Sequence, residues 1–167
     1  MPSDLLTLAL QPHEELQPHS DPSLVPMDLR WRDQLALAYL DAYPPGVAAE
    51  NLDDARQDID DTFAGEYGTL RNDASWVALQ GGRAVGAVHV VERSIWDPEL
   101  PGPFIIDLFV APAAAGQGLG RSLIRAAVAA CTQAGDTQLS LRIGAGTSAA
   151  AAHLYVGHGF MPLTQAR

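Results

Sequence analysis

Apolar residues first recur at regular spacing after residue 30, and the spacing is helical. A helix is predicted over residues 31–43, where one face is apolar and a Pro-Pro-Gly turn follows. A second helix is predicted from Asn51, a residue suited to an N-cap, to about Glu66. The preceding residues 11–28 hold four prolines and are interpreted as an irregular connection, and residues 5–10 are a candidate first strand.

From residue 76 onward the apolar period changes to that of β-strands. Residues 76–80 and 84–92 flank a Gly81-Gly82 turn and predict a β-hairpin. Residues 104–111, FIIDLFVA, are almost continuously apolar, which is typical of a strand buried on both faces, and Pro112 ends this strand.

Strands and helices alternate through the rest of the chain. A glycine-rich turn over residues 116–120 leads into a helix that runs to about Ala134. A strand over residues 137–143, a helix over residues 149–156 and a last short strand from Gly159 follow. This order predicts an α/β layout with a mixed sheet, in a single domain that includes an N-terminal extension.

Composition and charge narrow the functional classes. The 167 residues are 47% hydrophobic and 18% charged, without an apolar run long enough to span a membrane or a secretory signal, so a cytoplasmic globular domain is expected. The net charge is −10 and all ten basic residues are arginines, which argues against nucleic-acid binding. Fifteen of the twenty acids lie in residues 1–75, either for solubility or to attract a cationic acceptor. The single cysteine, Cys131, lies in an apolar helical pattern and is predicted to be buried, and no metal site is expected.

The segment VAPAAAGQGLGRSL, which starts at Val110, carries the clearest chemical signal. Backbone N–H groups of residues 117–121 are expected near the start of a helix, where glycines let an anion approach the backbone. The segment is therefore a candidate pyrophosphate cradle, although a tight turn with close strand–helix packing would need the same glycines. Two nucleotide motifs are excluded: the P-loop needs a lysine, and G-x-G-x-x-G fails at Arg121 or Leu123.

Two motifs together resemble the GNAT superfamily of acyl-CoA N-acyltransferases. The pattern [RQ]-x-x-G-x-G after a strand ending in V-x-P maps onto residues 115–120, and L-Y-x-x-x-G-F maps onto residues 154–160. The resemblance covers about residues 29–163. It implies a GNAT-like fold, with a mostly antiparallel central sheet splayed at the cofactor site and flanked by helices, and it implies acetyl-CoA as the acyl donor.

The resemblance also implies roles for individual residues. Tyr155 would protonate the leaving thiolate, although a packed aromatic with a satisfied hydroxyl is the alternative. The backbone at the end of the buried strand would pair with the pantetheine arm, and the glycine-rich turn would hold the diphosphate. The implied cofactor contacts are Leu108, Phe109, Val110, Gln117, Gly118, Leu119, Gly120 and Arg121.

The acid in the buried strand, Asp107, has three open interpretations. It could act as a base, directly or through water, it could anchor an ammonium group, or it could form a structural ion pair with Arg142. His89 is an alternative base, although a structural histidine fits its place in the hairpin equally. The acidic residues of the second helix, over 53–61, are either an amine-attracting rim or a solvated face.

The chain departs from the family pattern at three places. Ala115 replaces the usual Arg or Gln, and Arg121 is a candidate replacement charge. Ser148 stands where Asn is common and remains a competent cap. Only seven residues follow Phe160, so the strand that usually pairs there would come from another subunit, from the N-terminal extension or not at all.

These observations predict an N-acyltransferase in which a primary amine of a small molecule or peptide attacks acetyl-CoA directly. Polyamines, aminoglycosides, free amino acids and protein N-termini stay open as acceptors, as does a longer acyl donor. The alternatives are a non-catalytic acyl-CoA-binding or regulatory module and a structural partner with a degenerate pocket. No nucleic-acid or membrane partner is expected, and a homodimer stays open.

Overall fold

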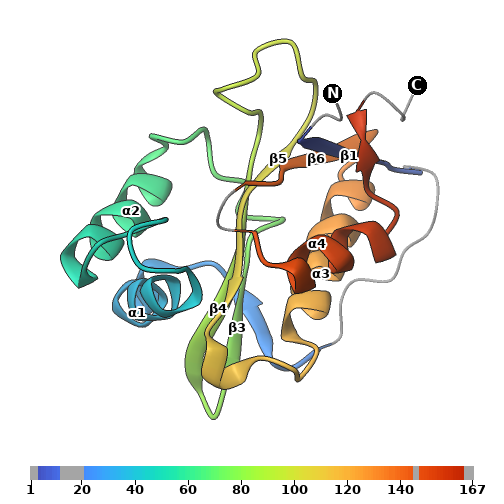
Figure 1. The fold of residues 1–167 in the computed structure, drawn as a ribbon. Coiled ribbons are helices and arrows are strands. Elements are labelled where there is room, and N and C mark those ends of the chain that lie inside the picture. The colour runs from blue at the N-terminus through green and yellow to red at the C-terminus, as the bar shows by residue number, and fades with distance from the viewer. Residues whose placement is uncertain (1–3, 12–20, 145–146, 164–167) are drawn as a thin grey trace.

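A seven-stranded sheet runs through the middle of the molecule in the order β2-β3-β4-β5-β6-β1-β7 (Figure 1). The computed structural model describes residues 4–11, 21–144 and 147–163. All neighbouring strands are antiparallel except β5 and β6, which are parallel. The strands are β1 Leu5–Ala9, β2 Leu24–Pro26, β3 Trp76–Gln80, β4 Arg83–Val91, β5 Phe104–Val110, β6 Gln138–Arg142 and β7 Met161–Pro162.

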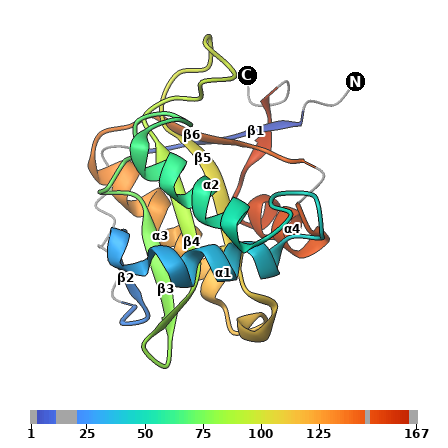
Figure 2. The same cartoon turned by 90° about the vertical axis from the view of Figure 1, so that its left-hand side faces the viewer.

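Helices cover both faces of this sheet. Helices α1 (Arg32–Ala42) and α2 (Leu52–Ala64) lie on one face, and α3 (Leu119–Gln133) and α4 (Ala149–Gly157) lie on the other. Figure 2 shows α1 and α2 crossing in front of the central strands. Two short 3-10 helices, Leu29–Trp31 and Pro112–Ala114, precede α1 and follow β5. The predicted mixed sheet, mostly antiparallel and flanked by helices, is confirmed.

Apolar residues from the two helical layers form two separate cores. Leu35 of α1 and Ile59 of α2 are buried against the β3–β4 hairpin, while Leu123 and Ile124 of α3 are buried against the opposite face. Cys131 is fully buried in the second core, as its place in the helical pattern predicted. No helix among the described residues is both long enough and apolar enough to cross a bilayer.

Side-chain caps start two of the helices. The Asn51 side chain accepts a hydrogen bond from the Asp54 N–H at 2.9 Å, which confirms the predicted N-cap of α2. Ser148 caps α4 by accepting from the Ala151 N–H at 3.0 Å. The preceding residue, Thr147, accepts from the Gly144 N–H, so its hydroxyl holds the loop before the helix.

The interpretation of residues 11–28 as wholly irregular is wrong at its C-terminal end. Strand β2 pairs with β3 there, and the Leu79 N–H donates to the Ser23 carbonyl at 2.7 Å. Proline is tolerated in this strand because β2 is at the edge of the sheet, where one side of its backbone has no strand to pair with. Residues 12–20, which carry two of the four prolines, lie outside the described residues.

The N-terminal extension supplies the strand that pairs with the end of the chain. Strand β1 lies between β6 and β7, with Thr7 opposite Ser140 on one side and Met161 on the other. The Ser140 hydroxyl donates to the Thr7 hydroxyl at 3.1 Å in a buried position. Of the three alternatives for the missing strand, the structure therefore selects the chain's own N-terminus.

Strands β5 and β6 pair over only two residues before they separate. Phe104 lies opposite Ser140 and Ile105 opposite Leu141. The register between β4 and β5 shifts just beyond this point, where His89 pairs with Asp107 but Val90 pairs with Ile105. Ile106 is thus the extra residue of a β-bulge, and such a bulge bends and twists its strand. A split opens in the sheet beside the second half of β5.

Candidate active site

A cavity of about 900 Å³ begins at this split and extends to both helical layers. Its lining comes from the bulged half of β5, the N-terminus of α3, helix α4, and residues of α1 and α2 on the opposite face. One continuous space therefore joins the glycine-rich turn to the acidic N-terminal helices.

The glycine-rich turn forms an open nest of backbone amides at the start of α3. Gly118 is the N-cap with φ 81°, and Gly116 has φ 80°, a region that L side chains rarely adopt. A Cβ added at either glycine would meet no other atom within 4 Å, so the turn faces open space rather than packed neighbours. Within the described part of the chain, no backbone acceptor is found for the N–H groups of residues 116 and 118–121. The helix dipole adds positive potential at the same place, so the turn suits an anion.

The side chains beside this turn divide into two groups. Arg121 lines the cavity, and no acidic side chain of the described residues forms an ion pair with it. Ala115 also lines the cavity, where the family pattern has Arg or Gln. Gln117 does not, because its side chain accepts a hydrogen bond from the Gln80 amide at 2.6 Å in an exposed position. Gln117 could therefore contact a ligand through its backbone only.

The backbone of β5 alternates between two directions. The Ala111 N–H donates to the Val85 carbonyl at 2.7 Å. In an antiparallel ladder every second residue forms such bonds, so Phe109 and Asp107 also direct their N–H and C=O groups toward β4. Phe109 follows that direction, whereas Leu108 and Val110 present their N–H and C=O groups to the split. Of the three predicted backbone contacts, the register thus favours Leu108 and Val110.

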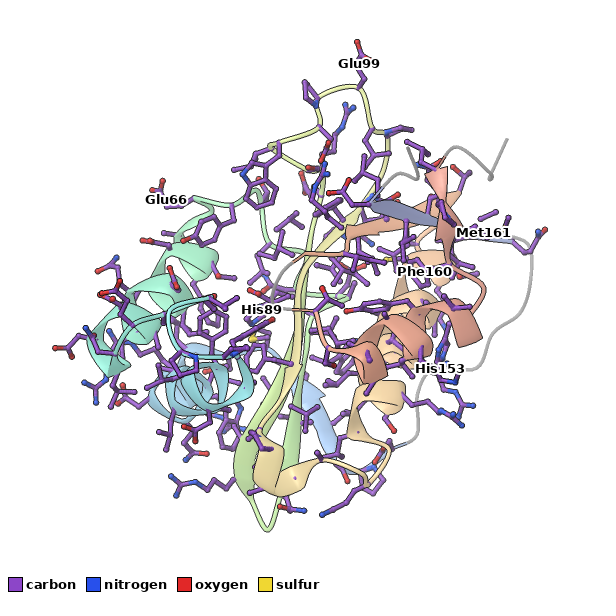
Figure 3. The ribbon with its side chains drawn as sticks, viewed as in Figure 1. Glu66, His89, Glu99, His153, Phe160 and Met161 are labelled. Carbon is purple, nitrogen blue, oxygen red and sulfur yellow. The ribbon has the colours of Figure 1, made fainter. Side chains whose placement is uncertain are left out.

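Asp107 pairs with a buried histidine on the neighbouring strand. The His89 Nδ1 lies 3.2 Å from Oδ2 of Asp107, and the His89 side chain is 0% exposed while that of Asp107 is 20% exposed. A carboxylate can only accept, so the shared proton lies on Nδ1. The His89 Nε2 is buried without a hydrogen-bond partner in the described residues. His89 is at the centre of the molecule (Figure 3), and only Asp107 of this pair lines the cavity.

The proposed ion pair between Asp107 and Arg142 is wrong. The Arg142 guanidinium instead binds Asp4 at 2.7 Å and Asp97 at 2.6 Å. Strands β5 and β6 stop pairing at Ile105 and Leu141, one position before Arg142, and the register of β5 with β4 places Asp107 opposite His89 instead.

Tyr155 faces the same cavity from α4. The residue is 6% exposed and its ring packs on Phe160 with centroids 5.9 Å apart. Burial, followed by the charge of Asp107, raises the pKa of Tyr155 to about 12. No described residue forms a hydrogen bond with its hydroxyl, and Tyr155 lines the cavity. The alternative interpretation of Tyr155 required a hydrogen-bond partner for its hydroxyl, and the described residues provide none.

Aromatic and acidic side chains line the cavity on the α1–α2 side, and sequence reasoning missed most of them. Tyr39 and Tyr43 of α1 meet edge to face with centroids 5.2 Å apart. Tyr67 donates to Asp58 at 3.0 Å and stacks on Trp96 with centroids 6.3 Å apart. These five side chains come from four separate segments, so no local motif joins them.

The acidic residues of α2 are not one functional rim. Asp60 pairs with Arg32 at 2.6 Å, Asp53 pairs with Arg56 at 3.1 Å, and the Asp61 carboxylate accepts from the Gln57 amide. Asp58 is the acid from this stretch that lines the cavity. The sequence could have indicated this position. Ala55 and Ile59 belong to the buried face of α2, and Asp58 lies one turn after Ala55 and next to Ile59, at the border of that face.

Comparisons with known proteins identify the family and the fold. The sequence model of the acetyltransferase (GNAT) family matches residues 31–160, while no curated protein sequence matches the chain. A GNAT-family structure from Novosphingobium aromaticivorans has a TM-score of 0.56 at 21% identity over 95% of this chain, which spans 59% of that protein. A GNAT-family acetyltransferase from Brucella melitensis, solved with acetyl-CoA, has a TM-score of 0.60 at 21% identity, and the match covers 87% of this chain and 90% of that protein. An aminoglycoside N-acetyltransferase solved with CoA has a TM-score of 0.61 at 16% identity, and the match covers 89% of this chain and 91% of that protein.

Identities this low show a shared fold, and the family assignment comes from the sequence model. That model spans most of the chain and includes both motifs on which the resemblance was based. The chain belongs to the GNAT family of acetyltransferases.

Proposed function

We propose that this chain transfers an acetyl group from acetyl-CoA to a primary amine by direct attack. The observation that carries the proposal is that one cavity is lined by Gly116, by residues 118–121 at the start of α3, by Tyr155 and by Asp107. An anion site, a proton donor and a proton acceptor are the groups that this transfer needs.

The residues on the α3–α4 side fit the acyl donor. The amides of residues 116–121 and the Arg121 guanidinium would hold the diphosphate, since open space lies beside Gly116 and Gly118. The backbone groups of Leu108 and Val110 would pair with the pantetheine arm and bind the carbonyl oxygen. The CoA-bound relatives support the same donor, which supplies an acyl group on a thioester.

Two proton transfers accompany this reaction, and residues of the chain would donate one proton and accept the other. The amine nitrogen forms a bond to the carbonyl carbon as the carbon–sulfur bond breaks, and the departing thiolate takes a proton from the Tyr155 hydroxyl. The amine must lose a proton, and Asp107 accepts it, directly or through water, while His89 orients that carboxylate. Proximity within one cavity lowers the barrier by holding both reactants in place. A covalent acyl-enzyme is unnecessary, because Cys131 is fully buried in the core of α3.

One departure supports a second candidate, a non-catalytic acyl-CoA-binding module. Ala115 removes a side chain that could contact a phosphate. A cavity that binds the donor without chemistry would still need the amide nest, but it would not need Asp107 and Tyr155 to share it.

Calorimetric titration with acetyl-CoA, followed by free-thiol release across a panel of amines, separates the candidates. Amine-dependent thiol release supports the acetyltransferase. Binding without release over the whole panel supports the module. Absence of both binding and CoA-dependent thermal stabilisation contradicts both, because a ligand selective for the native state must raise the Tm.

A further inference from the structure

Asp58 is a cavity-facing carboxylate that no described cation neutralises. The arginine–carboxylate ion pairs among the described residues come from Arg32, Arg56, Arg71 and Arg142, and none of these pairs includes Asp58. The chain also has no lysine. A partly buried carboxylate is costly unless it is paired, so this part of the cavity is arranged for a positive charge from outside.

The surroundings of Asp58 favour an organic cation. Burial raises the pKa of this carboxyl above its usual value, and the charge of Asp107 acts in the same direction, while the hydrogen bond from Tyr67 opposes both. The ring of Tyr67, which donates to Asp58, stacks on Trp96, and both rings line the cavity. Aromatic faces attract ammonium groups and pack against the carbon chain that carries them.

The two carboxylates of the cavity have different neighbours. Asp107 contacts His89 and lines the same cavity as Tyr155. Tyr155 is 6% exposed, and its hydroxyl has no hydrogen-bond partner among the described residues. Asp58, on α2, accepts a hydrogen bond from Tyr67, which follows α2 in the chain and stacks on Trp96 of the β4–β5 loop. One carboxylate is thus placed for the reacting amine and the other for a different group of the same molecule.

We infer that the acceptor carries a second cationic group besides the reacting amine, and that Asp58, Tyr67 and Trp96 bind this second group. The inference rests on the proposed function and names its acceptor class: an alkyl di- or polyamine-like cation rather than an amino acid. The second cation keeps its charge and takes no part in bond making, so the transfer step at the first amine is unchanged.

A length series of α,ω-diaminoalkanes, compared with n-alkylamines and ω-amino acids of equal chain length, tests the inference. With acetyl-CoA as donor, we expect the best diaminoalkane to exceed the alkylamine of equal length in kcat/KM by about tenfold or more. The reason is that only the diaminoalkane has a second ammonium group to contact the Asp58 carboxylate. The ω-amino acids should be the poorest, since their carboxylates face Asp58. Equal kcat/KM for all three classes overturns the inference but leaves the transferase proposal intact.

The variant Asp58→Asn keeps the shape and removes the charge. We expect it to lower the diamine-to-alkylamine ratio of kcat/KM by about tenfold or more, mainly through KM. The matched control is Asp61→Asn on the same helix, whose carboxylate accepts from Gln57 on the exposed surface and should leave the ratio within about twofold of wild type. An unchanged ratio in Asp58→Asn contradicts the inference.

Binding gives a readout that does not depend on turnover. Calorimetric titration of the preferred diaminoalkane into the CoA-bound protein should show an affinity that Asp58→Asn weakens and Asp61→Asn does not. If no amine is acetylated while this Asp58-dependent binding persists, the proposed chemistry fails and the dication site stands. If the diaminoalkane binds equally to wild type and to Asp58→Asn, the dication site fails.

Discussion

The Nδ1 atom of His89 lies 3.2 Å from Oδ2 of Asp107, directly across the ladder between β4 and β5. The histidine is fully buried and the carboxylate opens to the cavity. This arrangement makes Asp107 the catalytic candidate and His89 the residue that positions it. Because the bulge at Ile106 sets which residues face each other, the pair depends on the backbone as much as on its side chains.

Replacing Asp107 by Asn should lower kcat by about 100-fold or more, since a positioned proton acceptor typically contributes that much. Steady-state kinetics with the best amine checks this, and acetyl-CoA affinity should change little. Glu99→Gln, at the exposed tip of the β4–β5 loop (Figure 3), is the control and should behave as wild type. An undiminished kcat in Asp107→Asn would remove this residue from the mechanism.

The positioning role of His89 predicts a graded effect. His89→Asn retains an N–H near the Nδ1 position, so it should keep more activity than His89→Ala. The alanine variant should also lose about 2–4 kcal/mol of unfolding free energy through a core cavity. Measuring kcat and unfolding free energy together separates the two effects, because loss of orientation lowers kcat in the folded enzyme whereas destabilisation alone does not. A kcat in His89→Ala equal to that of wild type, at a temperature where both are folded, would make His89 purely structural.

Removing the Tyr155 hydroxyl should affect turnover rather than donor binding. Tyr155→Phe should lower kcat by about 10- to 100-fold, because the leaving thiolate loses its proton donor. The dissociation constant for acetyl-CoA, measured by calorimetry, should stay within about twofold, because the ring still packs on Phe160. Weakened donor binding with normal kcat would assign this tyrosine to the cofactor site instead.

Buried tyrosines predict a loss of stability in alkaline solution. Burial raises the pKa of Tyr155 and of Tyr67 to about 12, and it raises the pKa values of Tyr39 and Tyr43 still further. Above about pH 10 the unfolded chain releases these protons while the folded chain retains them, so the unfolding free energy falls as pH rises. The loss for Tyr155 and Tyr67 should be complete near pH 12. Chemical denaturation between about pH 9 and 12 should show a smaller loss for Tyr155→Phe than for wild type.

A charge at the glycine-rich turn should block the donor. Gly118→Glu should weaken acetyl-CoA binding by about 100-fold or more, because the side chain adds bulk and negative charge beside the amide nest. Gly135→Glu is the matched control, since Gly135 also has positive φ and open space but lies beyond the other end of α3. Both variants should lose about 1–2 kcal/mol of stability from the left-handed backbone. Unchanged donor affinity in Gly118→Glu contradicts the cradle.

The contribution of the N-terminal strand can be measured through Leu6, which is buried in β1 between β6 and β7. Leu6→Ala should reduce the unfolding free energy by about 2–4 kcal/mol through a core cavity. Leu29→Ala, at an exposed apolar side chain, should cost much less. Equal and small losses would mean that β1 does not hold the sheet in solution.

The sequence by itself determined the elements whose signals are local. The hairpin, the apolar strand before Pro112, the helix after the glycine-rich turn and the Asn51 cap were all predicted, because period, turn residues and caps act within a few positions. The two motifs also identified the family, and with it the Tyr155 and glycine-turn hypotheses. Strand β2 was missed because Pro22 and Pro26 signal a loop, and only the edge position of β2 makes Pro26 tolerable within it.

The tertiary structure decided every relationship that joins distant segments. It paired Asp107 with His89 rather than Arg142, because the register of β5 with its neighbours decides this pairing and no local pattern encodes that register. It placed β1 between β6 and β7, and it brought Asp58, Tyr67 and Trp96 to one end of the cavity. Side-chain type and spacing are properties of the chain, but which groups face each other across a cavity follows only from how the strands and helices pack.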